Sequence, residues 1–171
     1  MRKKLRRLSV RARLFIALIL LTLLGLGLWQ RYAWWNIPPY SGPKWRQDQE
    51  ASVMEAVFRY QISEHHGNQQ CFLSVQNLPP NHALMQRFAG LPYVLPLSNR
   101  FQSGARGYVD QNTGLPALYF WIDGLEWTSD MEVQVKGGGG AARMSGDAGE
   151  FKLLWKHREW HVLNYETQVR F

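Results

Sequence analysis

The chain has 171 residues, with 20 Lys and Arg against 13 Asp and Glu and a formal net charge of +7. Eight of the basic residues and none of the acidic ones precede Asn36, so residues 36–171 carry 12 basic against 13 acidic side chains. A segment near neutrality offers little counterion release to a polyanion, so we expect no nucleic-acid partner for it. The single cysteine, Cys71, excludes an intrachain disulfide.

An uncharged apolar run covers residues 14–29 and holds eight Leu, two Ile and one Phe. Each of these side chains favours bilayer insertion by about 0.3–0.6 kcal/mol at the centre of a helix. The run is shorter than the roughly 30 Å of hydrocarbon, and snorkelling of Arg11 and Arg13 would extend it to Val10. The pattern predicts a basic cytoplasmic tip over 1–13 and a transmembrane anchor over 14–35.

Aromatic residues end the predicted span, and basic residues precede it. Basic side chains on one flank place the N-terminus in the cytoplasm and the rest of the chain outside, on the periplasmic side if the chain is bacterial. A cleaved signal peptide is the alternative, with Gly25 and Gly27 as a small-x-small site. That site lies inside the apolar run, which favours an uncleaved anchor. The interfacial aromatic residues are Trp29, Tyr32, Trp34 and Trp35.

Residues 36–47 form a Pro-rich spacer, after which Asp48 can cap a helix that runs to about His65. Glu55 and Arg59 are spaced to form an ion pair on this helix, and Gly67 is a natural stop. An apolar stripe at helical spacing predicts the buried face. Its members are Val53, Met54, Val57, Phe58 and Ile62.

The rest of the chain shows the two-residue alternation of β-strands. Leu118, Phe120 and Ile122 share one face of a strand, and the Asp123-Gly124 step after them predicts a bulge. These patterns predict an α+β domain over 48–171, in which one long helix packs on a curved antiparallel sheet. Further strands are predicted at 71–75, 93–97, 107–110, 125–127, 131–136, 151–155 and 160–169, with a brief helix capped by Asn81 after the first.

Several short motifs mark the C-terminal half: Asp110-x-x-Thr113-Gly114, Ile122-x-x-Leu125-Glu126-Trp127, glycines 137–140, and Phe151-x-Leu-x-x-Lys-x-x-x-Trp160-x-Val162. In these motifs the chain resembles an uncharacterised group of exported, membrane-anchored bacterial proteins. The order of helix and curved sheet over 48–169 also resembles NTF2-like and cystatin-like rolls, although NTF2-like domains usually bring more helix before the first strand. The resemblance implies this fold and an exported location, and it supplies no catalytic residue.

Histidines and glycines offer two kinds of candidate site. His157 and His161 have the spacing of a zinc pair on a helix, but a hairpin at this position is expected to keep their rings apart. His65 and His66 fall at the predicted end of a helix, where a positively charged side chain interacts favourably with the helix dipole and the last carbonyls. The glycine run 137–140 does not lead into a helix, so we expect a loop or bulged strand and no phosphate site.

Thiol, acidic and aromatic residues complete the candidates. Cys71 begins an apolar strand and is expected to be a buried structural thiol. Asp123, Glu126 and Asp130 lie close enough in sequence to serve as acid and base, although alternation places some of them on the solvent face. Four tryptophans either fill the core or line a ligand pocket, and we favour the core. They are Trp121, Trp127, Trp155 and Trp160.

No catalytic residue, cofactor-binding residue or metal ligand is assigned from these patterns, and we expect no cofactor. The sequence favours a membrane-anchored extracytoplasmic binding or accessory module over an enzyme, with an envelope protein as partner. The alternative is an NTF2-like binder of small molecules, or an enzyme, that uses the Trp-rich face of the sheet. A filled sheet face favours the first interpretation, and a cavity with converging polar groups favours the second.

Overall fold

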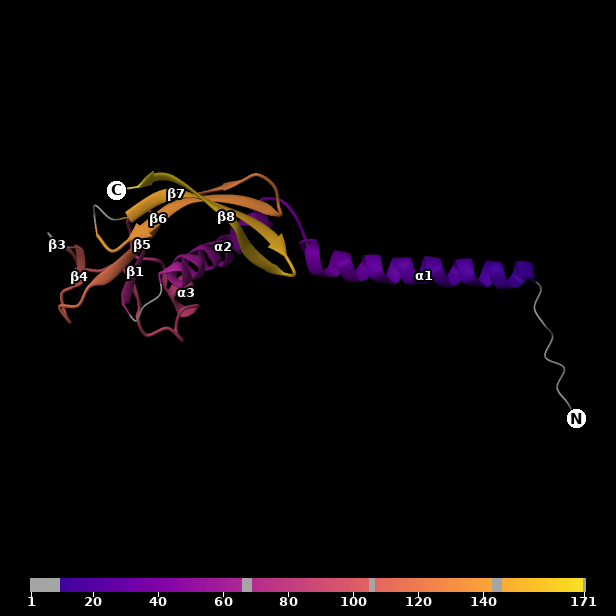
Figure 1. Ribbon diagram of the computed structural model, residues 1–171, viewed down its shortest axis with the longest axis horizontal. Coiled ribbons are helices and arrows are strands. Elements are labelled where there is room, and N and C mark those ends of the chain that lie inside the picture. Colours follow the sequence, from indigo (N-terminus) through magenta and orange to yellow (C-terminus); the bar gives the residue numbers. More distant parts are fainter. Residues whose placement is uncertain (1–9, 66–68, 105–106, 143–145, 171) are drawn as a thin grey trace, which may run out of the picture.

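The computed structural model describes residues 10–65, 69–104, 107–142 and 146–170, which form three helices and eight strands (Figure 1). In chain order these are α1 (Val10–Asn36), α2 (Pro43–Glu64), β1 (Gln70–Val75), α3 (His82–Gln86), β2 (Val94–Pro96), β3 (Phe101–Gly104), β4 (Gly107–Asp110), β5 (Ala117–Trp127), β6 (Glu132–Gly140), β7 (Gly146–Lys156) and β8 (Glu159–Arg170).

Helix α1 stands away from the rest of the molecule, which it meets only at its C-terminal end (Figure 1). Its segment Leu14–Asn36 is long and apolar enough to cross a membrane, and none of its most apolar window is buried within the protein. The apolar residues of this helix face all directions, which is the pattern of a helix whose surroundings are uniformly apolar.

Six strands form one curved sheet in the order β2-β1-β5-β6-β7-β8, and β3 and β4 form a separate hairpin. The sheet is mixed: β1 runs parallel to both β2 and β5, while the remaining neighbours are antiparallel. The prediction of a wholly antiparallel sheet is therefore wrong. Side-chain alternation reports which face a residue occupies but not strand direction, and here α3 and the β3–β4 hairpin supply the connections that parallel pairing needs.

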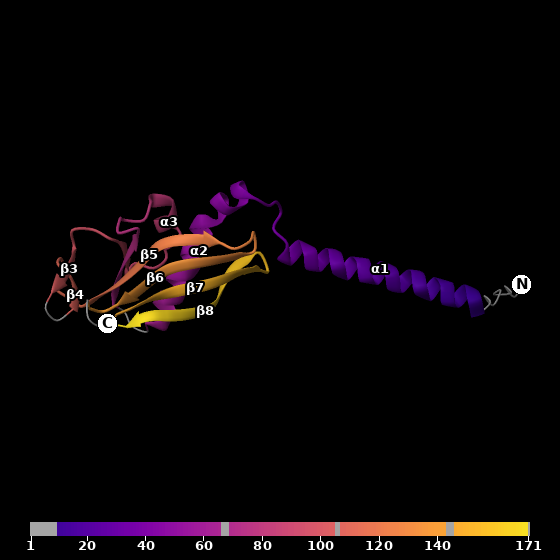
Figure 2. The same cartoon turned by 90° about the horizontal axis from the view of Figure 1, so that it is seen from above.

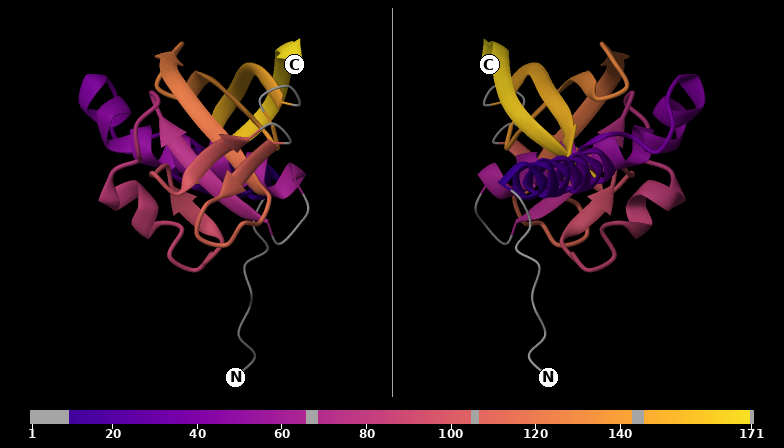
Figure 3. Two further views of the ribbon diagram at one scale, coloured as in Figure 1. Left: turned by 90° about the vertical axis from the view of Figure 1, so that its left-hand side faces the viewer. Right: turned by 90° about the vertical axis from the view of Figure 1, so that its right-hand side faces the viewer.

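Helix α2 covers one face of the sheet, running behind the strands as Figure 2 shows. The end-on views of Figure 3 show the two layers, with the helices on one side and the curved sheet on the other. Val53, Val57 and Phe58 of α2 are fully buried against the sheet, and Met54 and Ile62 pack at the edges of the core. The predicted apolar stripe is confirmed.

The predicted bulge in β5 is also confirmed. The register with β6 shifts between Ile122 and Gly124, so Asp123 is the extra residue. Because one residue is inserted, Leu125 and Trp127 stay on the core face that Ile122 occupies. Without the bulge, the second half of β5 would turn its apolar side chains to the outer face.

Other predicted boundaries differ from the structure. Helix α2 begins at Pro43, with Gly42 as its N-cap. Asp48 lies inside the helix, where its carboxylate accepts hydrogen bonds from Tyr40 and Lys44. The Asn81 cap of α3 is confirmed, since its side chain accepts from the N–H of Leu84 at 2.9 Å. Strand β3 was not predicted, and the predicted stop at Gly67 lies outside the described residues.

Candidate functional site

The turn between β7 and β8 lies against the C-terminal end of α1. The N–H of Arg158 donates to the carbonyl of Trp35 at 2.9 Å, and the N–H of His157 donates to Oδ1 of Asn36 at 3.4 Å. Asn36 is buried and donates through Nδ2 to the carbonyl of Tyr32 at 3.0 Å. The last carbonyls of a helix lack partners within it, so these bonds complete the end of α1. We call this contact the junction.

The side chain of Arg158 adds an electrostatic component to the junction. Its guanidinium carbon lies 4.2 Å from the centre of the Trp34 ring, a cation–π geometry worth about 0.5–2 kcal/mol. A cation at this position also interacts favourably with the negative end of the helix dipole. Sequence reasoning did not single out Arg158 or Asn36, because their roles depend on two segments far apart in the chain.

The backbone of the turn is unusual for its residues. His157 and Arg158 both have positive φ, at 54° and 67°. A two-residue hairpin with positive φ at both central positions is normally made by Asn-Gly or similar pairs, because other side chains are strained there. A strained turn that contacts α1 indicates that its residues serve the contact in addition to the reversal of the chain.

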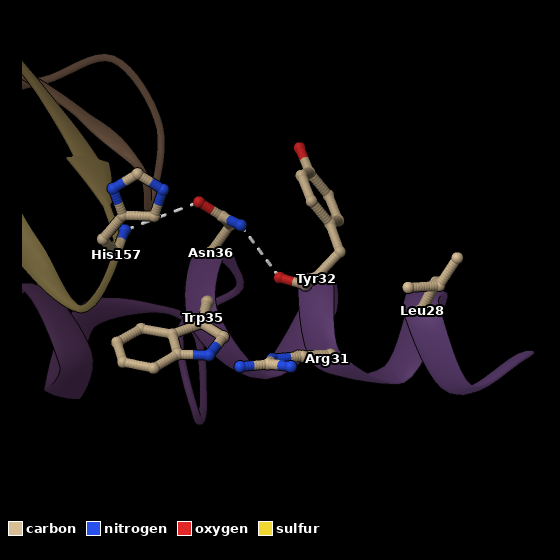
Figure 4. A pocket seen from close by; sticks show the side chains of 6 residues that line it. All are labelled: Leu28, Arg31, Tyr32, Trp35, Asn36 and His157. Carbon is tan, nitrogen blue, oxygen red and sulfur yellow. Dashed lines mark hydrogen bonds between the residues drawn. The ribbon is translucent and has the colours of Figure 1, made fainter.

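An open pocket of about 420 Å³ lies at the junction (Figure 4). Most of its lining comes from one face of α1, since residues 28, 31, 32, 35 and 36 follow helical spacing, and the turn supplies one end. The character of the lining changes along the helix from aliphatic at Leu28 to polar at the junction. The lining residues are Leu28, Arg31, Tyr32, Trp35, Asn36 and His157.

A second attachment holds the start of α2 against the turn after β5. The carboxylate of Asp130 accepts from the N–H of Gly42 at 3.0 Å and from Nε of Arg46 at 2.9 Å. Nε1 of Trp45 donates to the carbonyl of Asp130 at 2.9 Å. The Arg46 hydrogen bond and the Gly42 N–H lower the pKa of Asp130 from its usual value, so this residue is an ionised anchor of the linker and not a proton donor.

A groove of about 550 Å³ lies between α2 and the β7–β8 hairpin of the α+β domain. It combines two tryptophans with several charged side chains, and its hairpin side ends at Arg158 of the junction. We call this surface the groove. It is lined by Gln49, Ser52, Glu55, Ala56, Arg59, Arg87, Trp155, Arg158, Glu159 and Trp160.

An ion-pair network forms one wall of the groove. Glu55 accepts from Nε of Arg59 and from Nη1 of Arg87, both at 2.8 Å, which confirms the predicted Glu55–Arg59 pair. Arg87 also donates to Ser52 at 3.2 Å. Partial burial acts to raise the pKa of Glu55, but the two arginines outweigh it and the pKa is lowered. Two arginines and one carboxylate leave this wall with a net positive charge.

The two histidines of the hairpin lie closer together than expected. The ring centres of His157 and His161 are 6.4 Å apart, so the expectation that the hairpin separates them is wrong. The turn at His157 and Arg158 is tight enough to bring both rings to one side of the hairpin. Within the described residues no third His, Cys, Asp or Glu completes a metal-ligand group. His65 instead contacts the carbonyl of Gln61 at the end of α2.

The thiol and acidic candidates are not brought together. Cys71 is buried, and this burial raises its pKa to about 11, which makes the thiol a poor nucleophile at neutral pH. Asp123 and Glu126 are exposed. Asp130 is committed to the start of α2, so the three acids form no acid–base pair.

The glycine run and the tryptophans serve the sheet and its core. Residues 137–140 are members of β6, paired on both sides, so of the two expected alternatives the strand is present and the loop is not. The irregularity lies in the facing strand, between Ile122 and Gly124 of β5. A Cβ at Gly139 would lie 2.1 Å from the Phe120 ring, and one at Gly138 would lie 2.7 Å from the Trp121 ring. The glycines thus leave room for two rings to lie across β6. Trp155 and Trp160 are buried under α2, and Trp127 packs against the core beside Trp160. Trp121 instead lies half-buried on the opposite face of β5, stacked on Tyr119, so the expectation that it fills the core is wrong.

Comparisons with protein families, with curated proteins and with solved structures found no match for this chain. The candidate surfaces are therefore defined by their own geometry, namely the junction with its pocket and the groove beside it.

Proposed function

We propose that the chain is a single-pass membrane protein whose α+β domain lies outside the cytoplasm and binds a protein partner as an accessory module. The anchor rests on α1, whose apolar surface finds no cover within the described structure. Exposed apolar area of this extent is costly in water and is favourable in a bilayer. The basic residues before α1 support a cytoplasmic N-terminus, by the bias of basic flanks toward that side.

The observation that carries the binding function is the composition and position of the groove. Tryptophan and arginine are the residue types that dominate the energetics of protein interfaces. The groove exposes the side chains of Arg59 and Arg87, and Trp155 and Trp160, which are core residues only 7 % exposed, reach its floor with their edges. Because the groove adjoins the junction through Arg158, it would face a partner that lies at or near the same membrane. The junction would hold that surface at a defined orientation to the bilayer.

Binding of a small molecule is the second candidate, and the groove volume of about 550 Å³ falls in the usual range for ligand pockets. Ligand pockets are mostly apolar and enclose their ligand, whereas the groove is open and half of its lining residues are charged. The Trp-rich sheet face that an NTF2-like binder would use is filled by α2. These features favour a protein partner.

Photo-crosslinking in native membranes tests the proposal. A benzoyl-phenylalanine at Ser52, in the groove, is expected to give a discrete protein adduct, and the same group at Lys136, on the outer sheet face, is not. The charge reversal Arg87→Glu is expected to remove the Ser52 adduct. Equal yields of protein adduct from Ser52 and Lys136 would contradict the proposal that the groove is a specific binding surface. A small molecule retained by the solubilised protein, without any protein adduct, would favour the second candidate.

A further inference from the structure

The junction pocket changes in polarity along the axis of α1. Leu28 lies at the end of the pocket farther from the domain and is 62 % exposed. Arg31 and Tyr32 lie about one helical turn nearer the domain. His157 lies at the opposite end of the pocket from Leu28, beside Asn36 and at the left of Figure 4. An aliphatic side chain at one end, with an arginine and an imidazole toward the other, matches the order of acyl chain and phosphate in a phospholipid.

The donors of this pocket are free to bind an anion. Among the described residues, no carboxylate lies within ion-pair distance of Arg31. His157 uses its backbone N–H for Asn36, and within the described part of the chain its ring has no hydrogen bond and lies against the ring of His161. Arginine is suited to bidentate binding of phosphate oxygens, and an imidazole offers an N–H donor in either tautomer.

We propose that the junction pocket binds the phosphate of an anionic phospholipid, through Arg31 and His157, with an acyl chain along Leu28. The inference rests on the proposed membrane anchor. Tryptophan and tyrosine settle at the level of the headgroups, and Tyr32 and Trp35 line the pocket, while Trp29 and Trp34 lie on other faces of the same turns of α1. A lipid is favoured over a soluble phosphate because the pocket lies within this belt and one end of it is aliphatic.

A bound lipid would contribute to the orientation of the domain. Its phosphate would bridge α1 and the β7–β8 turn, which already meet through Asn36 and His157. The groove begins at the same turn, so a lipid bound there would help to fix the orientation of the surface that we propose for the partner. An accessory module of this kind would hold its binding surface best in membranes rich in anionic lipid.

The test uses the full chain in bilayers of phosphatidylcholine with and without photoactivatable phosphatidylglycerol, and adducts are mapped by mass spectrometry. Adducts are expected within 28–36 and at the β7–β8 turn. A basic residue near an anionic surface contributes about 1 kcal/mol, so Arg31→Gln is expected to lower these adducts about fivefold. His157→Gln is expected to lower them as well. Arg170→Gln removes the same charge at the far end of β8 and is expected to leave them unchanged.

Adducts in the basic tip over 1–13 serve as an internal reference, because those residues meet the other leaflet. Tip adducts without pocket adducts would overturn this inference and leave the anchor standing. Extraction of the protein by alkaline carbonate, with no adducts at all, would overturn both. Pocket adducts that persist in Arg31→Gln, or that inorganic phosphate displaces, would show that the pocket does not select a lipid phosphate. A protein adduct from benzoyl-phenylalanine at Leu28 would assign the pocket to a partner helix.

Discussion

The N–H of Arg158 donates a hydrogen bond of 2.9 Å to the carbonyl of Trp35, across more than a hundred residues of sequence. This bond joins the C-terminal end of an apolar helix to the tip of a β-hairpin. Residues 37–42, which link α1 to α2, contain two prolines and a glycine but no helix or strand of their own. The hairpin contact therefore fixes the angle between α1 and the domain, which the linker alone does not.

Loss of the Arg158 side chain should loosen this angle. In Arg158→Ala the cation–π contact with Trp34 is absent, while the backbone bond to Trp35 can still form. We expect the distance distribution between spin labels on α1, at Gln30, and on β6, at Lys136, to broaden in double electron–electron resonance. Lys156→Ala is the matched control, since it removes a charge from the same hairpin, and within the described residues its side chain has no hydrogen bond, ion pair or ring contact with α1. An equally narrow distribution in Arg158→Ala would contradict an orienting role.

The strained turn should limit the stability of the domain without its anchor. Replacing His157 and Arg158 by Asn and Gly supplies the pair that tolerates positive φ at both positions. In the fragment 37–171 we expect this change to raise the free energy of unfolding by about 0.5–1 kcal/mol, measured by urea unfolding. The same change in the full chain should broaden the distribution of distances between spin labels at Gln30 and Lys136. A less stable fragment would show that the turn residues make further contacts within the domain.

Gly139 should not accept a side chain. Its Cβ would lie 2.1 Å from Cδ1 of Phe120, whose ring is fully buried and cannot move away. We expect Gly139→Ala to lower the free energy of unfolding by about 1–3 kcal/mol, as overpacking does. Gly124→Ala is the control, because nothing lies within 4 Å of its Cβ position. Phe120→Leu should offset part of the cost in the double variant if the ring is the obstacle.

The sequence predicted the elements whose side chains follow a regular period. The α2 stripe at Val53, Val57 and Phe58 and the bulge at Asp123 depend on local spacing, and both are present in the structure. Strand direction was not predictable in the same way, because β1 has four consecutive buried residues, and such a run indicates a strand covered on both faces without giving the direction of its neighbours. The glycine run could not be assigned from the sequence to a loop or to a strand, since glycine favours loops unless large rings of a neighbouring strand require the space.

The candidate surfaces were harder to predict than the fold. Arg158, Asn36 and Arg87 act through contacts with segments that lie far away in sequence, and no motif of adjacent residues marks them. The aromatic belt at the end of α1 was recognised from composition, but its pairing with a hairpin turn was not. The one local signal was the turn itself, where a two-residue reversal lacks both Asn and Gly.

Asp110 should make stability depend on acid pH. The carboxylate is fully buried and accepts from Arg100 at 2.8 Å, from the N–H of Asn112 and from the hydroxyl of Thr113. The hydrogen bond from Arg100 has the largest effect, and together these donors lower the pKa of Asp110 in the folded protein. The stabilisation that the ionised Asp110 carboxylate provides is fully present above its unfolded-state pKa of about 3.9. It is lost as the pH falls through the lower pKa of the folded state.

Asp110→Asn should therefore be less stable than the native sequence at pH 7, and urea unfolding should show the difference shrinking below about pH 4. Asp123→Asn, at an exposed position, should follow the native sequence throughout. A difference between Asp110→Asn and the native protein that stays constant down to low pH would assign the loss to altered packing and not to the carboxylate charge.

The orientation of α1 is the last prediction. A reporter that is active only outside the cytoplasm should be active when fused after Phe171 and inactive when fused before Met1. The reason is the charge difference across α1: seven basic residues lie within 1–13, whereas Arg31 stands alone among aromatic residues at the other end. The mature chain should also keep its N-terminal segment, because the small residues Gly25 and Gly27 lie within the helix and not after it. An N-terminus at Leu28 in the purified protein would show cleavage, and the junction pocket would then lose its place at the membrane. Placing basic residues in the linker 37–42 and neutralising those in 1–13 should invert the reporter signals if charge sets the orientation.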